Sequence, residues 1–234
     1  MKQLSIVIPV FHEEKNIVKV LARIEKLVKT PHETIVIYDS EDDPTVKKVQ
    51  RSKLKVQNTA KLIKNSVGNG RGVMNAIKTG FKKAKGEAIV VTMADLCDDV
   101  SQIDMMYRYI LNGSDIVCAS RYMRGGKKIG GPLLKTFLSR LAGLTLYRFF
   151  GVPTHDATNA FKIYRRKIFD RIKIESTGGF EYSLEIVVKA HRLGYKIKEI
   201  PTVWRDREEG KSHFKLWRWL PNYVQSYLCI FKKP

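Results

Sequence analysis

The sequence has few acidic residues, few cysteines and no long apolar run. Its 23 aspartates and glutamates stand against 43 lysines and arginines, which leaves a formal charge of +20. The three cysteines lie far apart, so they predict neither a disulfide framework nor a metal site, and they favour a reducing cytoplasm. No stretch reaches the roughly 18 apolar residues that a membrane-spanning helix needs, and Leu4–Phe11 does not resemble a secretory signal.

The excess of positive charge predicts anionic partners, such as nucleic acid, anionic lipid or phosphorylated small molecules. From Arg121 onward, acidic residues become sparse and basic residues alternate with leucine, phenylalanine, tyrosine and tryptophan. This mixture is typical of segments that lie on a membrane surface rather than of a nucleic-acid-binding stripe. We therefore expect a peripheral protein on the cytoplasmic face of a membrane, with no nucleic acid partner.

The first 120 residues alternate between two kinds of pattern. Short apolar runs at 4–10, 34–38, 88–93 and 115–119 predict buried strands, and apolar residues at helical spacing predict helices over 15–29, 72–81 and 99–112. Asp99 is placed to cap the third helix and Gly113 to end it. Strands that alternate with helices predict an α/β fold, built on a mostly parallel central sheet flanked by helices.

The second half of the chain has a different pattern. Residues 133–150 predict an amphipathic helix whose leucines and phenylalanines are interrupted by Lys135, Arg140 and Arg148. Two interpretations stand equally, namely a helix buried against the sheet and a helix docked on a membrane surface. Residues 214–231 combine tryptophan and tyrosine, which favour the water–lipid boundary, with lysine and arginine, which favour anionic headgroups.

An apolar run that ends at Met93 is followed by three carboxylates, Asp95, Asp98 and Asp99. In an α/β protein, the carboxyl ends of the strands border the crevice where ligands bind. Carboxylate oxygens are the ligands that Mg²⁺ and Mn²⁺ prefer, and a metal-bound diphosphate suits such a place. The segment therefore predicts a site for a metal and a diphosphate, with a solvated acidic turn as the alternative.

Motifs in both halves of the chain resemble one family. In the first half they are Ile6–Glu14, Ile35–Thr45, the glycines Gly70, Gly72, Gly80 and Gly86, and Met93–Leu96. In the second half they are Ser120–Tyr122, Asp156–Tyr164, Phe180 with Glu185, Glu199–Pro201 and Arg207–Ser212. The first set resembles the family 2 inverting glycosyltransferases with the GT-A fold. The second set resembles the dolichol-phosphate mannose synthases and their bacterial polyprenyl-phosphate relatives.

The resemblance implies a domain organisation and a set of donor-binding residues. A GT-A domain would span 1–212, with a nucleotide-sugar-binding half over 1–120 and an acceptor half over 121–212, before a basic-aromatic membrane-proximal segment over 213–234. The residues implied to bind the donor are Pro9, Phe11, Glu13, Asp39, Gly70, Gly72 and Asp95. For Asp39, a turn aspartate that caps its own backbone is the alternative.

The resemblance also implies Mg²⁺ or Mn²⁺ as cofactor, held by Asp95 and Asp98. The metal would offset charge on the departing nucleoside diphosphate. The chain departs from the family pattern in one respect here, because Met93 stands where the family's metal motif begins with aspartate.

The resemblance implies catalytic roles for Asp95, Arg121 and Arg207. The two arginines suit such a role because a guanidinium matches a phosphate bidentately and stays charged. Arg121, Arg207, Asp156 and Ser212 are the expected acceptor-side residues, with His213 where many relatives have lysine. For Asp156, an ion pair with a neighbouring arginine is the alternative. Glu181 and Glu185 are expected either to face the sugar or to be solvated.

The implied reaction transfers a hexose, mannose or glucose, from a nucleotide-diphosphate sugar (a GDP- or UDP-hexose) to a polyprenyl phosphate, dolichyl or undecaprenyl, with inversion. A phosphate acceptor is already an anion, so the reaction needs no dedicated general base. Two alternatives stay open. One is a family 2 transferase with a saccharide hydroxyl acceptor, which would need a carboxylate base such as Asp156. The other is a non-catalytic nucleotide- or membrane-binding relative, which the methionine at position 93 suggests.

Overall fold

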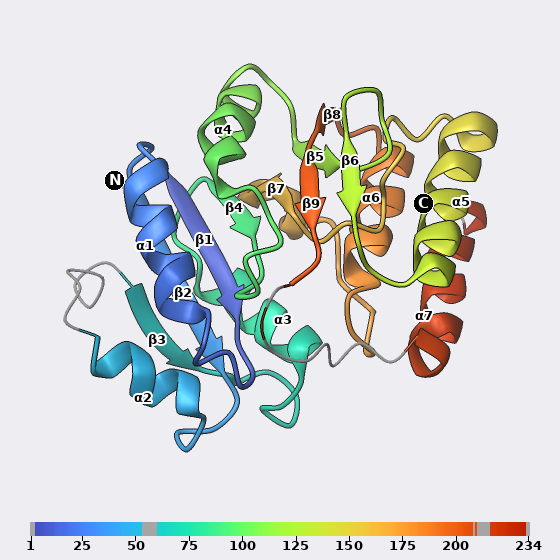
Figure 1. Cartoon of the computed structure of the whole chain (residues 1–234). Coiled ribbons are helices and arrows are strands. Elements are labelled where there is room, and N and C mark those ends of the chain that lie inside the picture. Colours follow the sequence, from blue (N-terminus) through green and yellow to red (C-terminus); the bar gives the residue numbers. More distant parts are fainter. Residues whose placement is uncertain (1–2, 53–59, 208, 210–215, 233–234) are drawn as a thin grey trace.

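A computed structural model describes residues 3–52, 60–207, 209 and 216–232. A seven-stranded sheet runs in the order β3-β2-β1-β4-β7-β5-β8, and Figure 1 shows it crossing the molecule. Its strands are β1 (Leu4–Pro9), β2 (His32–Tyr38), β3 (Ala60–Lys64), β4 (Ala88–Val91), β5 (Ile116–Ser120), β7 (Lys162–Arg165) and β8 (Ile197–Pro201). All neighbouring pairs are parallel except those of β7, which runs antiparallel to β4 and β5. The predicted α/β fold with a mostly parallel sheet is confirmed.

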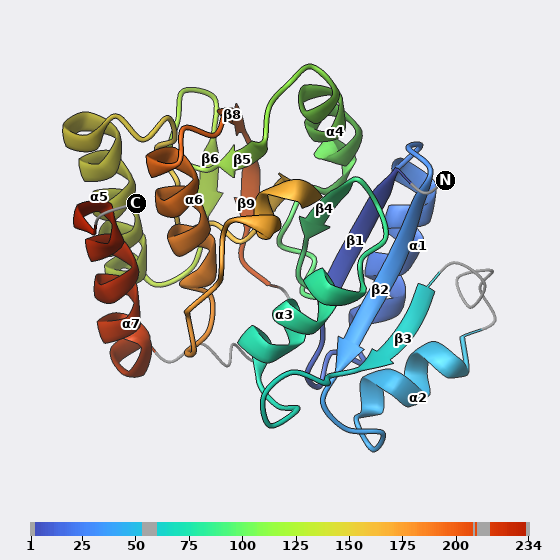
Figure 2. The ribbon, with the colours of Figure 1, turned by 180° about the vertical axis from the view of Figure 1, so that it is seen from behind.

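Helices cover both faces of this sheet, as two opposite views show (Figure 1 and Figure 2). On one face pack α1 (Ile17–Leu27), α2 (Pro44–Gln50) and α4 (Ile103–Leu111), and on the other α3 (Val73–Lys83) and α6 (Tyr182–Arg192). Central strands such as β1 and β4 are buried along their whole length, because each face carries a helix layer. Gly113 follows α4 at φ +96°, as predicted, but Asp99 caps the 3₁₀ turn that precedes α4, through the Ser101 amide, and not the helix itself.

The second half of the chain contributes to the same sheet and then builds outward from it. A two-stranded parallel sheet pairs β6 (Lys127–Ile129) with β9 (Val203–Arg205). Beyond α6 lie α5 (Leu133–Phe150) and α7 (Leu216–Leu228), which Figure 1 shows side by side at the end of the molecule farthest from β3. Short 3₁₀ turns cover Val100–Gln102, Arg166–Asp170 and Cys229–Phe231.

The long helix α5 is present, but it is not a core helix. Within it only Gly143 and Leu146 are buried, whereas Leu133 and Phe137 are 87% and 62% exposed. The interpretation of this segment as a helix buried against the sheet is therefore wrong. Among the helices that the structure describes, none is long and apolar enough to cross a membrane. The predicted boundary between 212 and 213 lies outside the described residues.

Candidate active site

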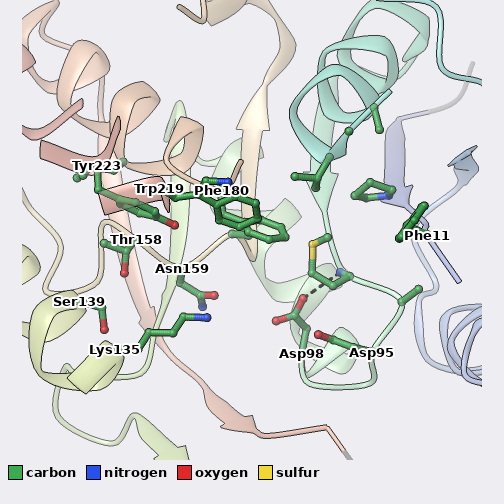
Figure 3. A pocket seen from close by; sticks show the side chains of 18 of the residues that line it. Phe11, Asp95, Asp98, Lys135, Ser139, Thr158, Asn159, Phe180, Trp219 and Tyr223 are labelled. Carbon is green, nitrogen blue, oxygen red and sulfur yellow. Dashed lines mark hydrogen bonds between the residues drawn. The ribbon is translucent and has the colours of Figure 1, made fainter. Parts of the chain in front are cut away.

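A cavity of about 1660 Å³ opens at the carboxyl ends of the parallel strands β1 to β4 and extends toward α5 and α7. At one end it is lined by Pro9, Phe11, Glu13, Asp39, Gly70, Gly72, Met93, Asp95 and Asp98, and at the other by Leu138, Leu141, Ala142, Thr145, Leu220, Tyr223, Val224 and Tyr227. Figure 3 shows the two ends facing each other, with Phe180 and Trp219 between them. All seven residues predicted to bind the donor thus lie at one end of a single cavity.

The first carboxylate at this end organises a glycine loop. One Asp39 oxygen accepts a hydrogen bond from the Asn65 side-chain amide at 2.9 Å, and the other accepts from the Gly72 amide at 2.7 Å. Gly70 and Gly72 have φ values of +69° and +88°, a region that side chains other than glycine rarely adopt. Asp39 therefore fixes the loop that leads into α3, while its neighbour Asp43 caps α2.

The loop after β4 presents its two aspartates differently. Asp95 lies beside the cavity, and its Oδ1 accepts a hydrogen bond from the Cys97 amide at 3.1 Å. The Asp98 carboxylate is buried and accepts hydrogen bonds from the Thr92 hydroxyl at 2.9 Å and the Met93 amide at 3.3 Å. Burial, followed by the charge of Asp95, raises the pKa of Asp98 to about 7. Both aspartates line the cavity, but one Asp98 oxygen is engaged by its own loop, so Asp95 is the more open of the two.

Arg207 reaches this end of the cavity from the opposite half of the molecule. Its Nη2 lies 3.1 Å from Asp95 Oδ2, and its Nη1 lies 3.4 Å from Glu13 Oε1. Burial raises the pKa of Glu13, and the positive charge of Arg207 partly opposes that shift. The structure thus brings together three predicted site residues, but as an ion-pair network among themselves. Ser212 and His213, which were predicted nearby, lie outside the described residues.

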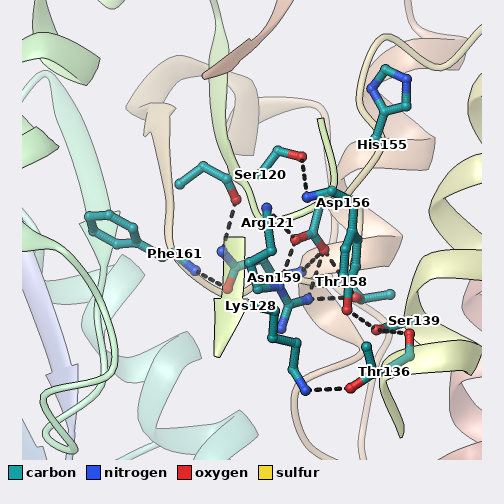
Figure 4. Close-up of polar contacts among 12 residues, drawn as sticks. Ser120, Arg121, Lys128, Thr136, Ser139, His155, Asp156, Thr158, Asn159 and Phe161 are labelled. Atoms are coloured by element: carbon teal, nitrogen blue, oxygen red, sulfur yellow. Dashed lines mark hydrogen bonds and ion pairs between the residues drawn. The ribbon is translucent and has the colours of Figure 1, made fainter. Parts of the chain in front are cut away.

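The second predicted arginine is held by a buried carboxylate. Arg121 donates from Nε and Nη2 to the two Asp156 oxygens, at 2.6 and 2.8 Å, and Nη2 also lies 3.2 Å from the Thr158 hydroxyl (Figure 4). Burial alone would raise the pKa of Asp156, but Arg121 outweighs it and the pKa is lowered. Of the two interpretations of Asp156, the ion pair with a neighbouring arginine is the one observed. With both oxygens engaged and no exposure, Asp156 is not placed to act as a base.

Two lysines that the sequence did not single out for the site line the middle of the cavity. Lys128 donates to the Gly130 carbonyl and the Thr136 hydroxyl, and its ammonium lies 5.1 Å from the centre of the Trp204 ring. Lys135 projects from the first turn of α5 toward the cavity (Figure 3). Burial, followed by repulsion from Arg121 and Lys128, lowers the pKa of Lys135 to about 8. Lys128, Lys135 and the nearby Arg121, which we call the cationic wall, therefore lie between the carboxylate end of the cavity and its apolar end.

The two glutamates expected near the sugar have another role. Glu181 accepts hydrogen bonds from the Gly178 and Gly179 amides, both at 2.7 Å. Glu185 accepts from the Glu175 and Ser176 amides and pairs with a lysine. Both side chains are buried, so the expectation that they face the sugar or solvent is wrong. They hold the loop over 175–179, which places Phe180 against Trp219 beside the cavity.

Comparison with known proteins identifies the architecture. Residues 5–173 match the family described as glycosyl transferase family 2. The chain belongs to this family. The resemblance predicted from the sequence motifs is thereby confirmed.

The curated relatives of this family 2 chain include three transferases with related names. A dolichol-phosphate mannosyltransferase of Pyrococcus furiosus is 28% identical over 91% of the chain and 59% of its own length. A polyprenol monophosphomannose synthase of Mycolicibacterium smegmatis is 22% identical over 88% of the chain and 79% of its own length. An undecaprenyl-phosphate 4-deoxy-4-formamido-L-arabinose transferase of Pseudomonas fluorescens is 25% identical over 98% of the chain and 65% of its own length. The chain thus spans less than two thirds of two of these relatives.

Solved structures share the fold at low sequence identity. Glucosyl-3-phosphoglycerate synthase from Mycobacterium tuberculosis, in complex with Mn²⁺, UDP-glucose and phosphoglyceric acid, superposes with a TM-score of 0.74. That match has 16% identity and covers 100% of this chain and 81% of the other. The same enzyme with Mn²⁺, UDP and glucosyl-3-phosphoglycerate gives a TM-score of 0.72 over the same shares, also at 16% identity. These likenesses confirm the predicted GT-A-type arrangement of the chain.

Proposed function

We propose that this chain is a glycosyltransferase that moves a hexose, mannose or glucose, from a nucleoside-diphosphate sugar to a polyprenyl phosphate, with inversion, at the cytoplasmic face of a membrane. The observation that carries the proposal is the order of surfaces along one cavity. A carboxylate end at the strand termini is followed by a cationic wall and then by an apolar groove between α5 and α7. This order matches a nucleotide sugar, a phosphate and an isoprenoid chain. The names of the curated relatives support the same substrate classes.

The donor would occupy the end organised by Asp39 and the glycine loop. Phe11 is 48% exposed at its rim, where its ring can stack on a nucleobase. The backbone at Gly70 and Gly72 would let the donor approach closely, because these residues carry no side chain. The donor's sugar would then point along the cavity toward Lys135.

A divalent metal fits this end if the donor's diphosphate supplies part of its ligands. Asp95 offers a carboxylate, the Met93 side chain has no oxygen, and one Asp98 oxygen is engaged by its own loop. Among the described residues no group of three potential ligands gathers to hold a metal. Mg²⁺ is commonly held by one or two carboxylates together with substrate phosphates, so Asp95 and a diphosphate suffice. When bound, the metal would supply Lewis-acid stabilisation of the leaving diphosphate.

The acceptor phosphate would sit against Lys135 and Lys128, with Arg121 beside them. A phosphate monoester is already anionic at neutral pH, so attack on the anomeric carbon needs orientation and charge neutralisation rather than proton removal. The engagement of Asp156 by Arg121 supports this acceptor over a sugar hydroxyl, because the expected base is unavailable. The isoprenoid chain would leave between α5 and α7, where the Tyr227 hydroxyl donates to Thr145 and links the two helices.

Membrane docking would complete the acceptor end. Leu133, Phe137 and Phe149 on α5 are exposed, and so are Trp217 and Phe231 near the carboxyl terminus. Exposed apolar side chains among lysines and arginines suit the headgroup region of an anionic bilayer. The proposed orientation would bring the mouth of the groove to the lipid phase, where the acceptor resides.

A transfer assay with the purified chain tests the proposed function. Radiolabelled GDP-mannose, UDP-glucose and GDP-glucose are each incubated with a short polyprenyl phosphate and Mn²⁺ or Mg²⁺, and lipid-extractable label is measured. We expect one donor to give a labelled lipid of inverted anomeric configuration. Label that enters only a soluble saccharide would overturn the acceptor assignment, and no label in any product would overturn the transferase itself.

A further inference from the structure

Asp95 faces a cation in the structure, and that cation is a side chain. Arg207 Nη2 lies 3.1 Å from Asp95 Oδ2, the one oxygen of this carboxylate that is not engaged by the Cys97 amide. Glu13 binds the other arm of the guanidinium at 3.4 Å. The side chains of all three residues are less than one-fifth exposed, so this is not a loose surface pair.

The chain around Arg207 is tied down on the same side of the cavity. The Asp206 amide donates to the Ile129 carbonyl at 2.9 Å, and the Arg205 amide donates to the Cys97 carbonyl at 3.4 Å. The second contact joins the strand before Arg207 directly to the loop that carries Asp95. Backbone hydrogen bonds therefore place Arg207 next to Asp95, in addition to the attraction between their charges.

We propose that Arg207 and a divalent cation compete for Asp95, so that the chain without nucleotide binds the cation weakly. A guanidinium and a divalent ion are both positively charged, so they repel one another across the few ångströms that one carboxylate spans. A metal on a diphosphate brings its own anionic ligands, which offset the loss of the Arg207 pair, whereas a bare ion does not. The cation would therefore enter with the donor, and Arg207 would then turn to the phosphates. This inference rests on the proposed function only in naming the donor as the carrier.

Mn²⁺ binding to the nucleotide-free chain tests this competition. The free-ion signal in electron paramagnetic resonance is titrated with wild type, Arg207→Met and Arg205→Met. Arg205→Met is the matched control. Arg205 is exposed and lies two residues before Arg207, so its substitution removes the same charge without removing a contact of the Asp95 carboxylate. We expect Arg207→Met to bind Mn²⁺ at least about tenfold more tightly than wild type, and Arg205→Met to gain less than about twofold.

A double variant assigns the gain to the right carboxylate. Adding Asp95→Asn to Arg207→Met should return Mn²⁺ affinity to the wild-type level or below. The competition would be overturned by equal Mn²⁺ affinity in Arg207→Met and wild type, by an equal gain in Arg205→Met, or by a gain that survives in the double variant. No sugar or lipid takes part, so these results stand apart from the transfer assay, and a failure of either idea leaves the other measurable.

Discussion

The two ends of the cavity are built in opposite ways. At the donor end, Asp39, Asp95 and Asp98 each accept a hydrogen bond from at least one backbone amide, and the strands that precede them are buried. At the acceptor end, the eighteen residues of α5 bury only Gly143 and Leu146. The end that we propose for the donor is thus held by hydrogen bonds among the described residues of the chain itself. The acceptor end exposes the kind of surface that a folded protein normally covers.

The attachment of α5 explains how such a helix holds its place. A Cβ at Gly143 would lie 2.0 Å from the His155 carbonyl oxygen, so glycine permits the helix to touch the loop that carries Asp156. One turn further along, the Tyr147 ring stacks on His155 with centroids 4.0 Å apart. A few close contacts therefore fix α5 beside the cationic wall and leave its other faces free for an apolar environment.

The largest effect is expected at the donor end, from Asp95→Asn. This change removes the charge of the carboxylate that we propose holds the metal while keeping the side chain's size. Transfer should fall at least about 100-fold, as for the loss of a major electrostatic contact in a transition state, with an unchanged thermal unfolding temperature. Asp99→Asn is the matched control, because Asp99 caps a turn and does not line the cavity. Retention of more than about a tenth of the wild-type rate by Asp95→Asn would show that the two ends do not divide the chemistry in this way.

At the cationic wall, Lys135→Met should impair use of the acceptor without impairing binding of the nucleotide. Loss of a partly buried charge that would pair with the acceptor phosphate costs about 2 kcal/mol, so kcat/KM for the polyprenyl phosphate should fall about 30-fold. Binding of the nucleoside diphosphate, measured by calorimetry, should stay within about twofold. Lys127→Met, at an exposed position in β6, supplies the control. A comparable loss of nucleotide affinity would instead place Lys135 at the donor end.

The sequence predicted the donor half more fully than the acceptor half, and the reason is local. Buried strands such as Leu4–Pro9 have short-range apolar patterns, and Asp99 and Gly113 mark helix ends by their own chemistry. The donor residues follow strand ends, so the parallel topology alone brings them to one edge of the sheet.

Several of the parts that the sequence did not predict depend on long-range contacts. Strand β7 inserts antiparallel between β4 and β5, although it comes from the second half of the chain. Glu13 and Arg207 meet across 194 residues, and no local pattern encodes that pairing. Lys135 looked like one of several basic interruptions in an apolar helix. Its meaning follows only from the tertiary position of the first turn of α5.

The exposed face of α5 should show its role in vesicle binding. Phe137→Ser removes a 62% exposed ring and should weaken binding to anionic vesicles about tenfold, close to the transfer free energy of a partly inserted aromatic side chain. Leu111→Ser is the control, because Leu111 is equally exposed, at 60%, but belongs to α4 on the other side of the sheet. Binding should also weaken as salt rises, since screening reduces attraction to the headgroups. Equal effects of the two variants would argue against α5 as the docking surface.

The smallest effect concerns the pH dependence of the acceptor end. Burial, followed by repulsion from Arg121 and Lys128, lowers the pKa of Lys135 to about 8, so the ammonium is present below that pH and is lost above it. The acceptor phosphate is about nine-tenths dianionic at pH 7, because its second pKa is near 6, so above pH 7 it adds a change of only about a tenth. Since kcat/KM reports ionisations of the free enzyme, its value for the polyprenyl phosphate should halve near pH 8 and fall about fourfold by pH 8.5.

Lys135→Arg distinguishes this titration from any general decline at alkaline pH. A guanidinium keeps its charge throughout this range, so the variant's profile should stay flat from pH 7 to 8.5, even if its absolute rate is lower because the fork differs in shape from an ammonium. The donor end offers the internal reference, since nucleoside diphosphate binding by wild type should not follow the same curve. A decline of equal size in wild type and Lys135→Arg would mean that another group titrates, and the cationic wall would then owe its charge at neutral pH to Lys128 and Arg121.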